Sequence, residues 1–191
     1  MKKQDLRKTY RELRLNLTQK QVNVLNDLLL IQFQQMPLDI PARIMTYAPM
    51  EKHKEFNPQA ITDYCYFKNP DQQLIYPLMD EVKGRQQIIP ILVEDETLFE
   101  TNAFGVDEPV GGIDLHPEEI EMVIVPLLCF DERGYRVGYG NGYYDYFLRH
   151  CRPDCIKIGF SYFAPVPEIE DVADHDVKLD LCVTHDRVYA F

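Results

Sequence analysis

The feature that most constrains the fold is an uninterrupted apolar stretch at residues 122–130, MVIVPLLCF. It is about half as long as a membrane-spanning helix, which needs roughly 20 residues. A strand that is apolar on both faces is typical of the centre of a parallel sheet with helices on either side. This stretch therefore predicts a buried central strand in an α/β domain.

Shorter apolar runs alternate with helical or polar segments along the rest of the chain. The further predicted strands are residues 43–48, 73–78, 88–93, 155–162, 179–184 and 187–191. A capping box at Thr18 starts a helix over residues 19–35, and Asn57 caps another that begins at Pro58. The alternation predicts a three-layer α/β domain with a mostly parallel sheet. Because 191 residues suit one ordinary domain, we expect a single domain over residues 1–191.

The N-terminal segment, residues 2–17, predicts an amphipathic helix with a narrow apolar stripe. The stripe comprises Leu6, Tyr10, Leu13 and Leu17. Basic side chains flank it, namely Lys3, Arg7, Arg11 and Arg14. A solvated basic face is the ordinary alternative for such charges.

Charge is distributed unevenly along the chain. Residues 1–20 hold seven basic and two acidic residues, whereas the rest of the chain holds 13 basic and 29 acidic ones, for a net charge of −11. An acidic body repels nucleic acid, so the basic helix predicts a small anionic ligand rather than DNA or RNA. A nucleic-acid or partner-binding role for the basic helix is the less supported alternative.

The N-terminus shows no apolar signal segment, so we expect a cytoplasmic protein without membrane partners. The five cysteines occur at no framework spacing and are expected to be reduced. Cys151 and Cys155 lie near His150, but their spacing does not fit a zinc ribbon and no second pair follows.

The densest cluster of glycines lies in residues 136–147, RVGYGNGYYDYF, where Gly138, Gly140 and Gly142 alternate. No glycine of the chain precedes a lysine, which excludes a Walker loop, and the spacing differs from G-x-G-x-x-G. One interpretation is a hairpin turning at residues 131–134. The other is a phosphate cradle, because alternating glycines cost backbone entropy unless a ligand must approach the main chain.

Flanking residues favour the cradle. Arg136 precedes the loop and can add a charge-assisted contact to phosphate, and Asp145 follows it as a natural Mg²⁺ ligand or as a residue of the first helical turn. Tyrosines that could stack on a flat heterocycle gather here. They are Tyr135, Tyr139, Tyr143, Tyr144 and Tyr146.

Residues 125–148, VPLLCFDERGYRVGYGNGYYDYFL, closely resemble the signature of the 5-formyltetrahydrofolate cyclo-ligase family, also called methenyltetrahydrofolate synthetases. The resemblance covers the whole chain. Lys3 and Arg7 match its basic N-terminal helix. Three further segments match its pattern, namely residues 46–58, 104–109 and 175–184.

The resemblance implies a Rossmann-like three-layer α/β/α fold and ATP- and Mg²⁺-dependent cyclisation of 5-formyltetrahydrofolate to 5,10-methenyltetrahydrofolate. It implies catalytic roles for Arg136 and Asp145. The implied ATP contacts are Lys3, Arg7, Arg136, Val137, Gly138, Tyr139, Gly140, Asn141, Gly142, Tyr143 and Tyr144. The implied folate contacts are Ala48, Glu55, Tyr139, Gly140, Asn141, Gly142 and Tyr143. The implied metal ligands are Asp145 and Asp180.

Two positions depart from the family pattern. Residues 51–54, EKHK, lengthen the loop before Glu55, which could otherwise be a solvated loop carboxylate. Tyr146 follows Asp145 where the family often has Arg or a small residue. A non-catalytic folate- or nucleotide-binding protein of the same fold is the alternative, and we expect a monomer or weak homo-oligomer.

Overall fold

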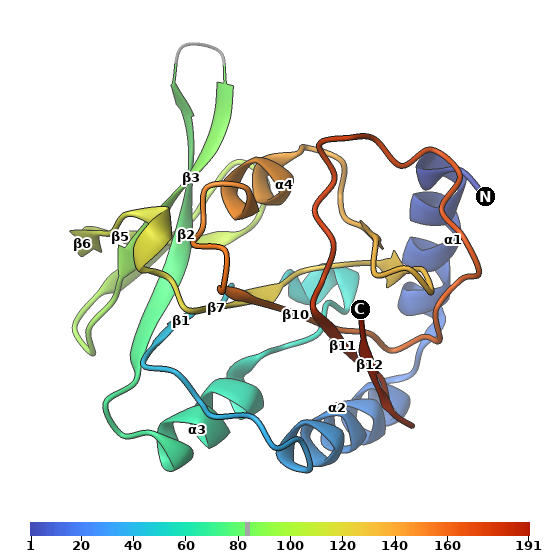
Figure 1. The fold of residues 1–191 in the computed structure, drawn as a ribbon, viewed down its shortest axis with the longest axis horizontal. Coiled ribbons are helices and arrows are strands. Elements are labelled where there is room, and N and C mark those ends of the chain that lie inside the picture. Colours follow the sequence, from blue (N-terminus) through green and yellow to red (C-terminus); the bar gives the residue numbers. More distant parts are fainter. Residues whose placement is uncertain (83–84) are drawn as a thin grey trace.

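An eight-stranded sheet forms the middle layer of the structure, a computed structural model that describes residues 1–82 and 85–191 (Figure 1). Its strands in chain order are β1 (Arg43–Met45), β2 (Gln73–Val82), β3 (Arg85–Leu92), β6 (Ile113–Asp114), β7 (Met122–Val125), β10 (Ile156–Phe160), β11 (Leu181–Val183) and β12 (Val188–Ala190). Two small hairpins lie outside it, formed by β4 (Leu98–Thr101) with β5 (Asp107–Val110) and by β8 (Cys129–Phe130) with β9 (Arg136–Val137). The helices are α1 (Lys3–Asn16), α2 (Gln19–Gln34), α3 (Gln59–Lys68) and α4 (Tyr143–Leu148), with short 3₁₀ turns at Glu51–His53 and Pro117–Glu119.

The centre of the sheet is parallel, as predicted. The strand order is β12-β11-β10-β7-β1-β2-β3-β6, and β11, β10, β7, β1 and β2 run parallel to one another. Antiparallel strands β12, β3 and β6 complete the two edges. The chain leaves β1 toward β2 on one side and returns through β7 on the other. The gap between the carboxyl ends of β1 and β7 is therefore the topological switch point, where open α/β sheets bind ligands.

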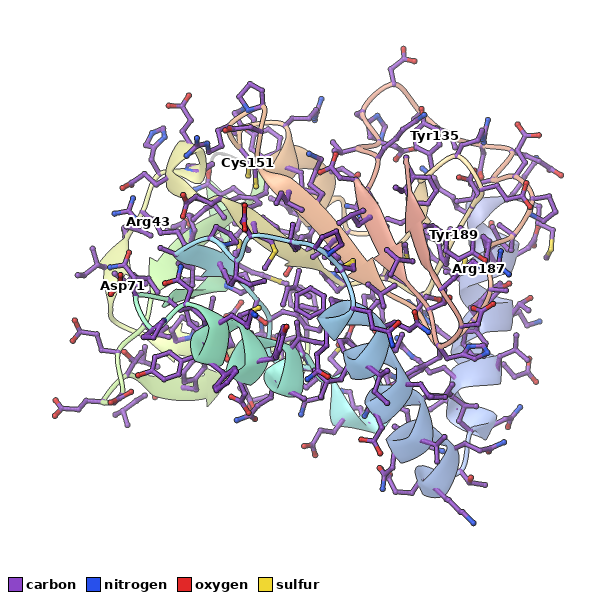
Figure 2. The ribbon with its side chains drawn as sticks, turned by 60° about the horizontal axis from the view of Figure 1, so that its bottom comes forward. Arg43, Asp71, Tyr135, Cys151, Arg187 and Tyr189 are labelled. Atoms are coloured by element: carbon purple, nitrogen blue, oxygen red, sulfur yellow. The ribbon has the colours of Figure 1, made fainter. Side chains whose placement is uncertain are left out.

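Helices cover both faces of the sheet, which confirms the three-layer prediction. Ile44 packs with α2 and α3 in one core cluster, whereas its neighbour Met45 packs with α4 in the other. Alternate residues of β7 divide in the same way, with Ile124 in the first cluster and Val123 in the second. Figure 2 shows α2 and α3 lying along one face with their side chains against the strands. Strand β7 is apolar on both faces because it is buried between two helical layers.

The predicted strand over residues 122–130 is shorter in the structure. Strand β7 ends at Val125, and Cys129 and Phe130 belong to the β8–β9 hairpin, where they pair with Val137 and Arg136. Pro126 has no amide hydrogen to donate to a sheet ladder, so the chain leaves the sheet there. The hairpin turning at residues 131–134 is thus present, and the glycine loop follows its second strand.

Strands β2 and β3 form a longer hairpin than predicted, extending beyond the body of the sheet (Figure 1). Pro77 and Pro90 are register partners, so two residues that cannot donate in the ladder face each other. Strands β4, β5 and β6 were not predicted from the sequence.

Two helix starts test the capping predictions. The Thr18 hydroxyl accepts from the Gln21 amide and the Gln21 side chain accepts from the Thr18 amide, which confirms the capping box. Helix α3 begins at Gln59 with Pro58 as its N-cap, one residue later than predicted. Asn57 still accepts a hydrogen bond from the Gln59 amide at 3.0 Å, so its side chain caps the turn from one position further out.

The predicted stripe of α1 is partly wrong. Leu6 is fully buried, but Leu13 is 43% exposed and Arg14 is only 3% exposed. Consecutive helix residues lie about 100° apart, so Leu13 is at one edge of the predicted stripe and Arg14 is beyond its other edge, and spacing alone does not decide which of them is buried. The Arg14 side chain points inward and donates hydrogen bonds to the Leu127 carbonyl and the Tyr139 hydroxyl.

Candidate active site

A cavity of about 370 Å³ opens at the switch point of the sheet. Tyr47 and Ala48 follow β1, and Pro126 follows β7, so the carboxyl ends of both strands form its floor. The glycine loop and the start of α4 form one wall, and residues of the 50–55 and 104–106 segments form the other. Ala48, Glu55 and the loop residues Gly138 to Tyr144, which were predicted as site residues, therefore meet around one cavity.

The glycine loop reaches the cavity through backbone conformations that favour glycine. Gly140 and Gly142 have φ angles of +105° and +76°. A Cβ at Gly140 would lie 3.2 Å from the guanidinium carbon of Arg7, so that side chain lies against the loop. A Cβ at Gly138 would meet no atom within 4 Å, which leaves open space over the backbone for a ligand.

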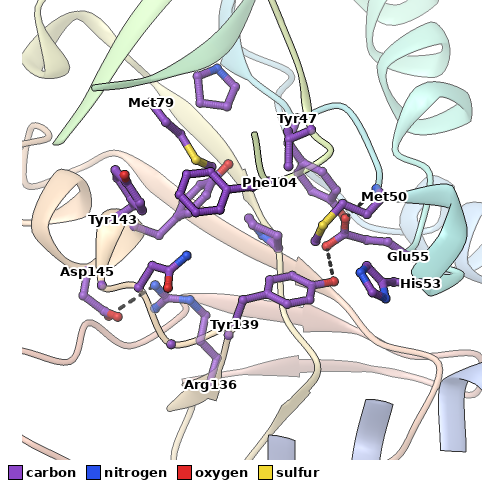
Figure 3. A pocket seen from close by; sticks show the side chains of 18 of the residues that line it. Tyr47, Met50, His53, Glu55, Met79, Phe104, Arg136, Tyr139, Tyr143 and Asp145 are labelled. Atoms are coloured by element: carbon purple, nitrogen blue, oxygen red, sulfur yellow. Dashed lines mark hydrogen bonds and ion pairs between the residues drawn. The ribbon is translucent and has the colours of Figure 1, made fainter. Parts of the chain in front are cut away.

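Arg136 and Asp145 join the two ends of this loop. A guanidinium nitrogen of Arg136 lies 3.2 Å from Asp145 Oδ1, and the Arg136 side chain is 4% exposed. The segment around Val177 completes the network, because its carbonyl accepts from Arg136 at 2.7 Å and its amide donates to Asp145 at 2.9 Å. Figure 3 shows this ion pair on one side of the cavity.

The basic face of α1 approaches the same loop. Arg7 donates from Nε to the Gly138 carbonyl at 3.1 Å, and Arg11 lies over the Tyr139 ring at 5.6 Å from its centre. Lys3 forms an ion pair with Asp176, which lines the cavity, although Lys3 itself does not. Burial alone would raise the pKa of Asp176, but hydrogen bonds from Lys3 and the Ala173 amide hold it below its ordinary value.

Glu55 lies on the opposite side of the cavity, 7% exposed. Its Oε1 accepts from the Tyr139 hydroxyl and its Oε2 from the Met50 amide, both at 2.8 Å (Figure 3). Burial raises the pKa of this carboxyl, while the Met50 amide, the Tyr139 hydroxyl and the charge of Arg14 lower it. Lys54, just before it, adopts a left-handed φ of +48° and donates to the Leu15 carbonyl at 2.7 Å, which ties this loop to the end of α1.

Apolar and aromatic side chains line the cavity between the Arg136–Asp145 ion pair and Glu55. They are Tyr47, Met50, Met79, Phe104, Val106 and Tyr143. His53 is close by, with its ring centre 6.5 Å from that of Tyr139. Burial lowers the pKa of His53, and the charges of Lys52, Arg14 and Arg11 lower it further. An apolar cavity with cations at its edge suits an anionic ligand that carries a ring.

A family model, the 5-formyltetrahydrofolate cyclo-ligase family, matches residues 1–185 of this sequence. The chain belongs to the 5-formyltetrahydrofolate cyclo-ligase family. A cyclo-ligase from Mycoplasma genitalium is 33% identical over 70 residues, which cover 36% of this chain and less than half, 42%, of that protein. A cyclo-ligase from Escherichia coli K12 is 24% identical over 175 residues, covering 83% of this chain and 92% of its own length. The solved structure of a 5,10-methenyltetrahydrofolate synthetase from Aquifex aeolicus is similar over 100% of this chain and 93% of that one, with a TM-score of 0.79 and 28% identity.

One residue assigned from the cyclo-ligase pattern lies elsewhere. Asp180 does not line the cavity; its Oδ2 accepts from the backbone amide of Lys157 at 2.7 Å and from that residue's Nζ at 2.8 Å. It precedes β11 and thus lies at the amino ends of the parallel strands, whereas the cavity lies at their carboxyl ends. This structure therefore does not bring Asp180 and Asp145, the two predicted metal ligands, to the same cavity. Glu55 lies on the opposite side of the cavity, and the carboxylate that lines it together with Asp145 is Asp176.

Other residues of the site differ in how far the sequence indicated them. Val137, which was predicted as an ATP contact, is buried under α1 beside Leu6 and does not line the cavity. Phe104 and Asp176 fall in segments that match the cyclo-ligase pattern, and that match was the signal available for them. Met79 comes from the middle of a long strand, and no local pattern marks it.

The acidic groups at the cavity fit a magnesium ion shared with phosphates. Within residues 1–82 and 85–191, no group of three or more His, Cys, Asp or Glu side chains is arranged to hold a metal. Mg²⁺ bound to a nucleotide usually takes only one or two carboxylates, with phosphates and water supplying the rest. Asp145 and Asp176 both line the cavity, each beside a basic side chain that can pair with phosphate instead. This donor set suits a metal–nucleotide complex.

Proposed function

We propose that this protein catalyses the cyclisation of 5-formyltetrahydrofolate to 5,10-methenyltetrahydrofolate, using ATP with Mg²⁺ and releasing ADP and phosphate. The observation that carries the proposal is the two-sided cavity. Arg136 and the glycine loop form a phosphate-binding side, and Glu55 forms a polar end for a heterocycle. Tyr139 belongs to the loop and also contacts Glu55, so two substrates would lie next to each other.

The phosphate side supports ATP as the co-substrate. Backbone amides between Gly138 and Gly142 would face the phosphates, and Arg136 and Arg7 would neutralise their charge. Lys3 would contribute by leaving Asp176 for a phosphate oxygen. Phosphoryl transfer depends on such positioning and charge neutralisation more than on a protein nucleophile.

The opposite side supports a pterin. Glu55 would accept hydrogen bonds from the ring, and Ala48 with Tyr143 would contact its faces. The hydroxyl of Tyr144, a residue that lines the cavity, is buried without a hydrogen-bond partner in the described part of the chain. A bound substrate that satisfied this hydroxyl would remove the cost of leaving it unpaired.

Magnesium would be held by Asp145, with Asp176 as the second carboxylate. When bound, the ion would neutralise part of the negative charge on the transferred phosphoryl group. The residues of the chain would act around it, with Arg136 released from Asp145 to bind a phosphate oxygen.

The proposed reaction has two steps, a phosphoryl transfer and a ring closure. The formyl oxygen attacks the γ-phosphorus and the bond to ADP breaks, which gives an imidate-like intermediate whose former formyl oxygen carries the phosphate. The neighbouring anilino nitrogen then attacks the former formyl carbon and releases its proton, and inorganic phosphate leaves with the former formyl oxygen. The cavity's apolar wall would keep water from hydrolysing the activated intermediate.

A direct assay tests the proposal. Purified protein is mixed with 5-formyltetrahydrofolate, ATP and Mg²⁺, and the absorbance of methenyltetrahydrofolate is followed. We expect product formation that requires both ATP and the metal. Binding of both substrates without product would instead support a non-catalytic folate- or nucleotide-binding protein.

The cellular location and the oligomeric state of the protein are also proposed. We propose a cytoplasmic enzyme that acts on small molecules as a monomer or weak homo-oligomer. In the described residues, no helix combines the length and apolar character needed to span a bilayer.

A further inference from the structure

Arg14 is a buried cation that the proposed chemistry does not use. Its side chain donates to the Leu127 carbonyl at 3.4 Å and to the Tyr139 hydroxyl at 2.5 Å. Its Nε is buried without a hydrogen-bond partner in the described residues. Burying an incompletely paired guanidinium costs free energy. The fold therefore tolerates a destabilising charge at this position, and its best-placed partner is Tyr139.

The hydrogen bond from Arg14 determines in which direction the Tyr139 hydroxyl donates its own hydrogen. A phenol has one hydrogen to donate, and a guanidinium can only donate. The oxygen of Tyr139 must therefore accept from Arg14, and its single hydrogen is left for Glu55 Oε1 at 2.8 Å. Since the Met50 amide holds Oε2, both oxygens of Glu55 are oriented by this network.

We infer that Arg14 is a positioning residue that acts through Tyr139 to orient the Glu55 carboxylate toward the second substrate. The identity of that substrate rests on the proposed function. The two hydrogen bonds that link Arg14 to Tyr139 and Tyr139 to Glu55 are observed in the structure and do not depend on that function.

The groups around Glu55 make Arg14 its important charged neighbour. The phenols that interact with it electrostatically have pKa values raised by burial, which keeps them neutral at physiological pH. They are Tyr47, Tyr139, Tyr144 and Tyr162. The positive charge of Arg14 lowers the pKa of Glu55, so removing that charge should raise it.

Helix α1 thereby connects the two sides of the cavity. Arg7 and Arg14 are two helical turns apart and contact the adjacent loop residues Gly138 and Tyr139. The half of α1 nearer the N-terminus serves the phosphate side, and the other half serves Glu55.

An NMR titration tests the inference without any need for activity. The protein is labelled with ¹³C at the glutamate carboxyl carbons, and the Glu55 signal is assigned from its absence in Glu55→Gln. We expect Arg14→Gln to raise the pKa of Glu55, Arg14→Lys to raise it less, and Lys8→Gln on the exposed face of α1 to leave it unchanged. An unchanged pKa of Glu55 in Arg14→Gln, in a protein with a wild-type melting curve, would overturn the inference.

A double-mutant cycle provides a second test and does not depend on Arg14→Gln being fully stable. Tyr139→Phe removes only the hydroxyl through which Arg14 would act. We expect each single change to weaken binding of 5-formyltetrahydrofolate about tenfold, the double variant to lose little more, and ATP affinity to stay within about twofold. Losses that multiply in the double variant would overturn the inference. A wild-type protein that forms no methenyltetrahydrofolate would refute the proposed function, and the titration would still decide the role of Arg14.

Discussion

The guanidinium of Arg136 lies 3.2 Å from the carboxylate of Asp145, so the residue before the glycine loop is paired with a residue just after it. The pair holds the ends of the loop together while its backbone turns through Gly140 and Gly142. In the proposed reaction both groups acquire new partners, because the guanidinium binds phosphate and the carboxylate binds metal. The ion pair therefore keeps two reactive groups in place before the substrates arrive.

Asp145→Asn tests the metal assignment. The amide can still accept from the Val177 amide, so the fold should be kept, but its oxygen is a much weaker magnesium ligand. We expect turnover to fall by about 100-fold or more, measured by product absorbance across a range of Mg²⁺ concentrations. Asp154→Asn is the control, because it breaks an exposed Arg–Asp pair remote from the cavity. Wild-type magnesium dependence in Asp145→Asn would mean that this carboxylate is no ligand.

Glu55 should make stability depend on pH. Burial raises its pKa above the ordinary 4.5, so the folded protein binds this proton more readily than the unfolded chain. The free energy of unfolding should therefore lose a contribution as pH rises from about 4.5 through the folded-state pKa. Glu55→Gln removes the titrating group, and urea unfolding at a series of pH values should show a flatter profile.

Glu51→Gln serves as the matched control for this measurement, since Glu51 is exposed in the same loop. It should keep the wild-type pH profile. A Glu55→Gln profile that runs parallel to that of the wild type would show that Glu55 is not shifted by burial.

Gly140→Ala should damage both the fold and nucleotide binding. At φ +105° an alanine is strained, and its Cβ would press on Arg7. We expect a loss of about 1–2 kcal/mol in unfolding free energy and a raised KM for ATP. Gly111→Ala is the control: its φ is +82° but its Cβ would meet no atom within 4 Å. That variant should lose a similar stability while keeping its KM, and equal KM values in both variants would contradict the role given to Gly140.

Lys3→Met should separate the two substrates kinetically. The change removes the cation that pairs with Asp176 at the edge of the phosphate side. We expect the KM for ATP to rise about tenfold and the KM for 5-formyltetrahydrofolate to change little. Lys2→Met, which removes an exposed neighbouring charge, should leave both unchanged. A rise in the KM for 5-formyltetrahydrofolate alone would contradict the placement of Lys3 on the phosphate side of the cavity.

Sequence patterns predicted the fold well where the signal was local or long. The doubly apolar segment before Pro126 is a central parallel strand, and the capping box at Thr18 begins a helix as expected. Sequence patterns failed where a tertiary contact decides which side chain is buried. Leu13 and Arg14 lie about 100° apart at opposite edges of the apolar stripe of α1, and the hydrogen bond to the Tyr139 hydroxyl explains why the arginine is the one that points inward.

By itself the sequence determined the three-layer parallel architecture and the glycine loop with Arg136 and Asp145 at its ends, because periodicity and contiguous motifs are written along the chain. Only the tertiary structure decided which of the two nearby aspartates, Asp176 or Asp180, lines the cavity with Asp145. Asp176 and Asp180 are four residues apart in a segment without regular structure. The register of β11 against β10 places Asp180 beside Lys157 at the amino ends of the strands, while the preceding turn brings Asp176 to the cavity, where it pairs with Lys3.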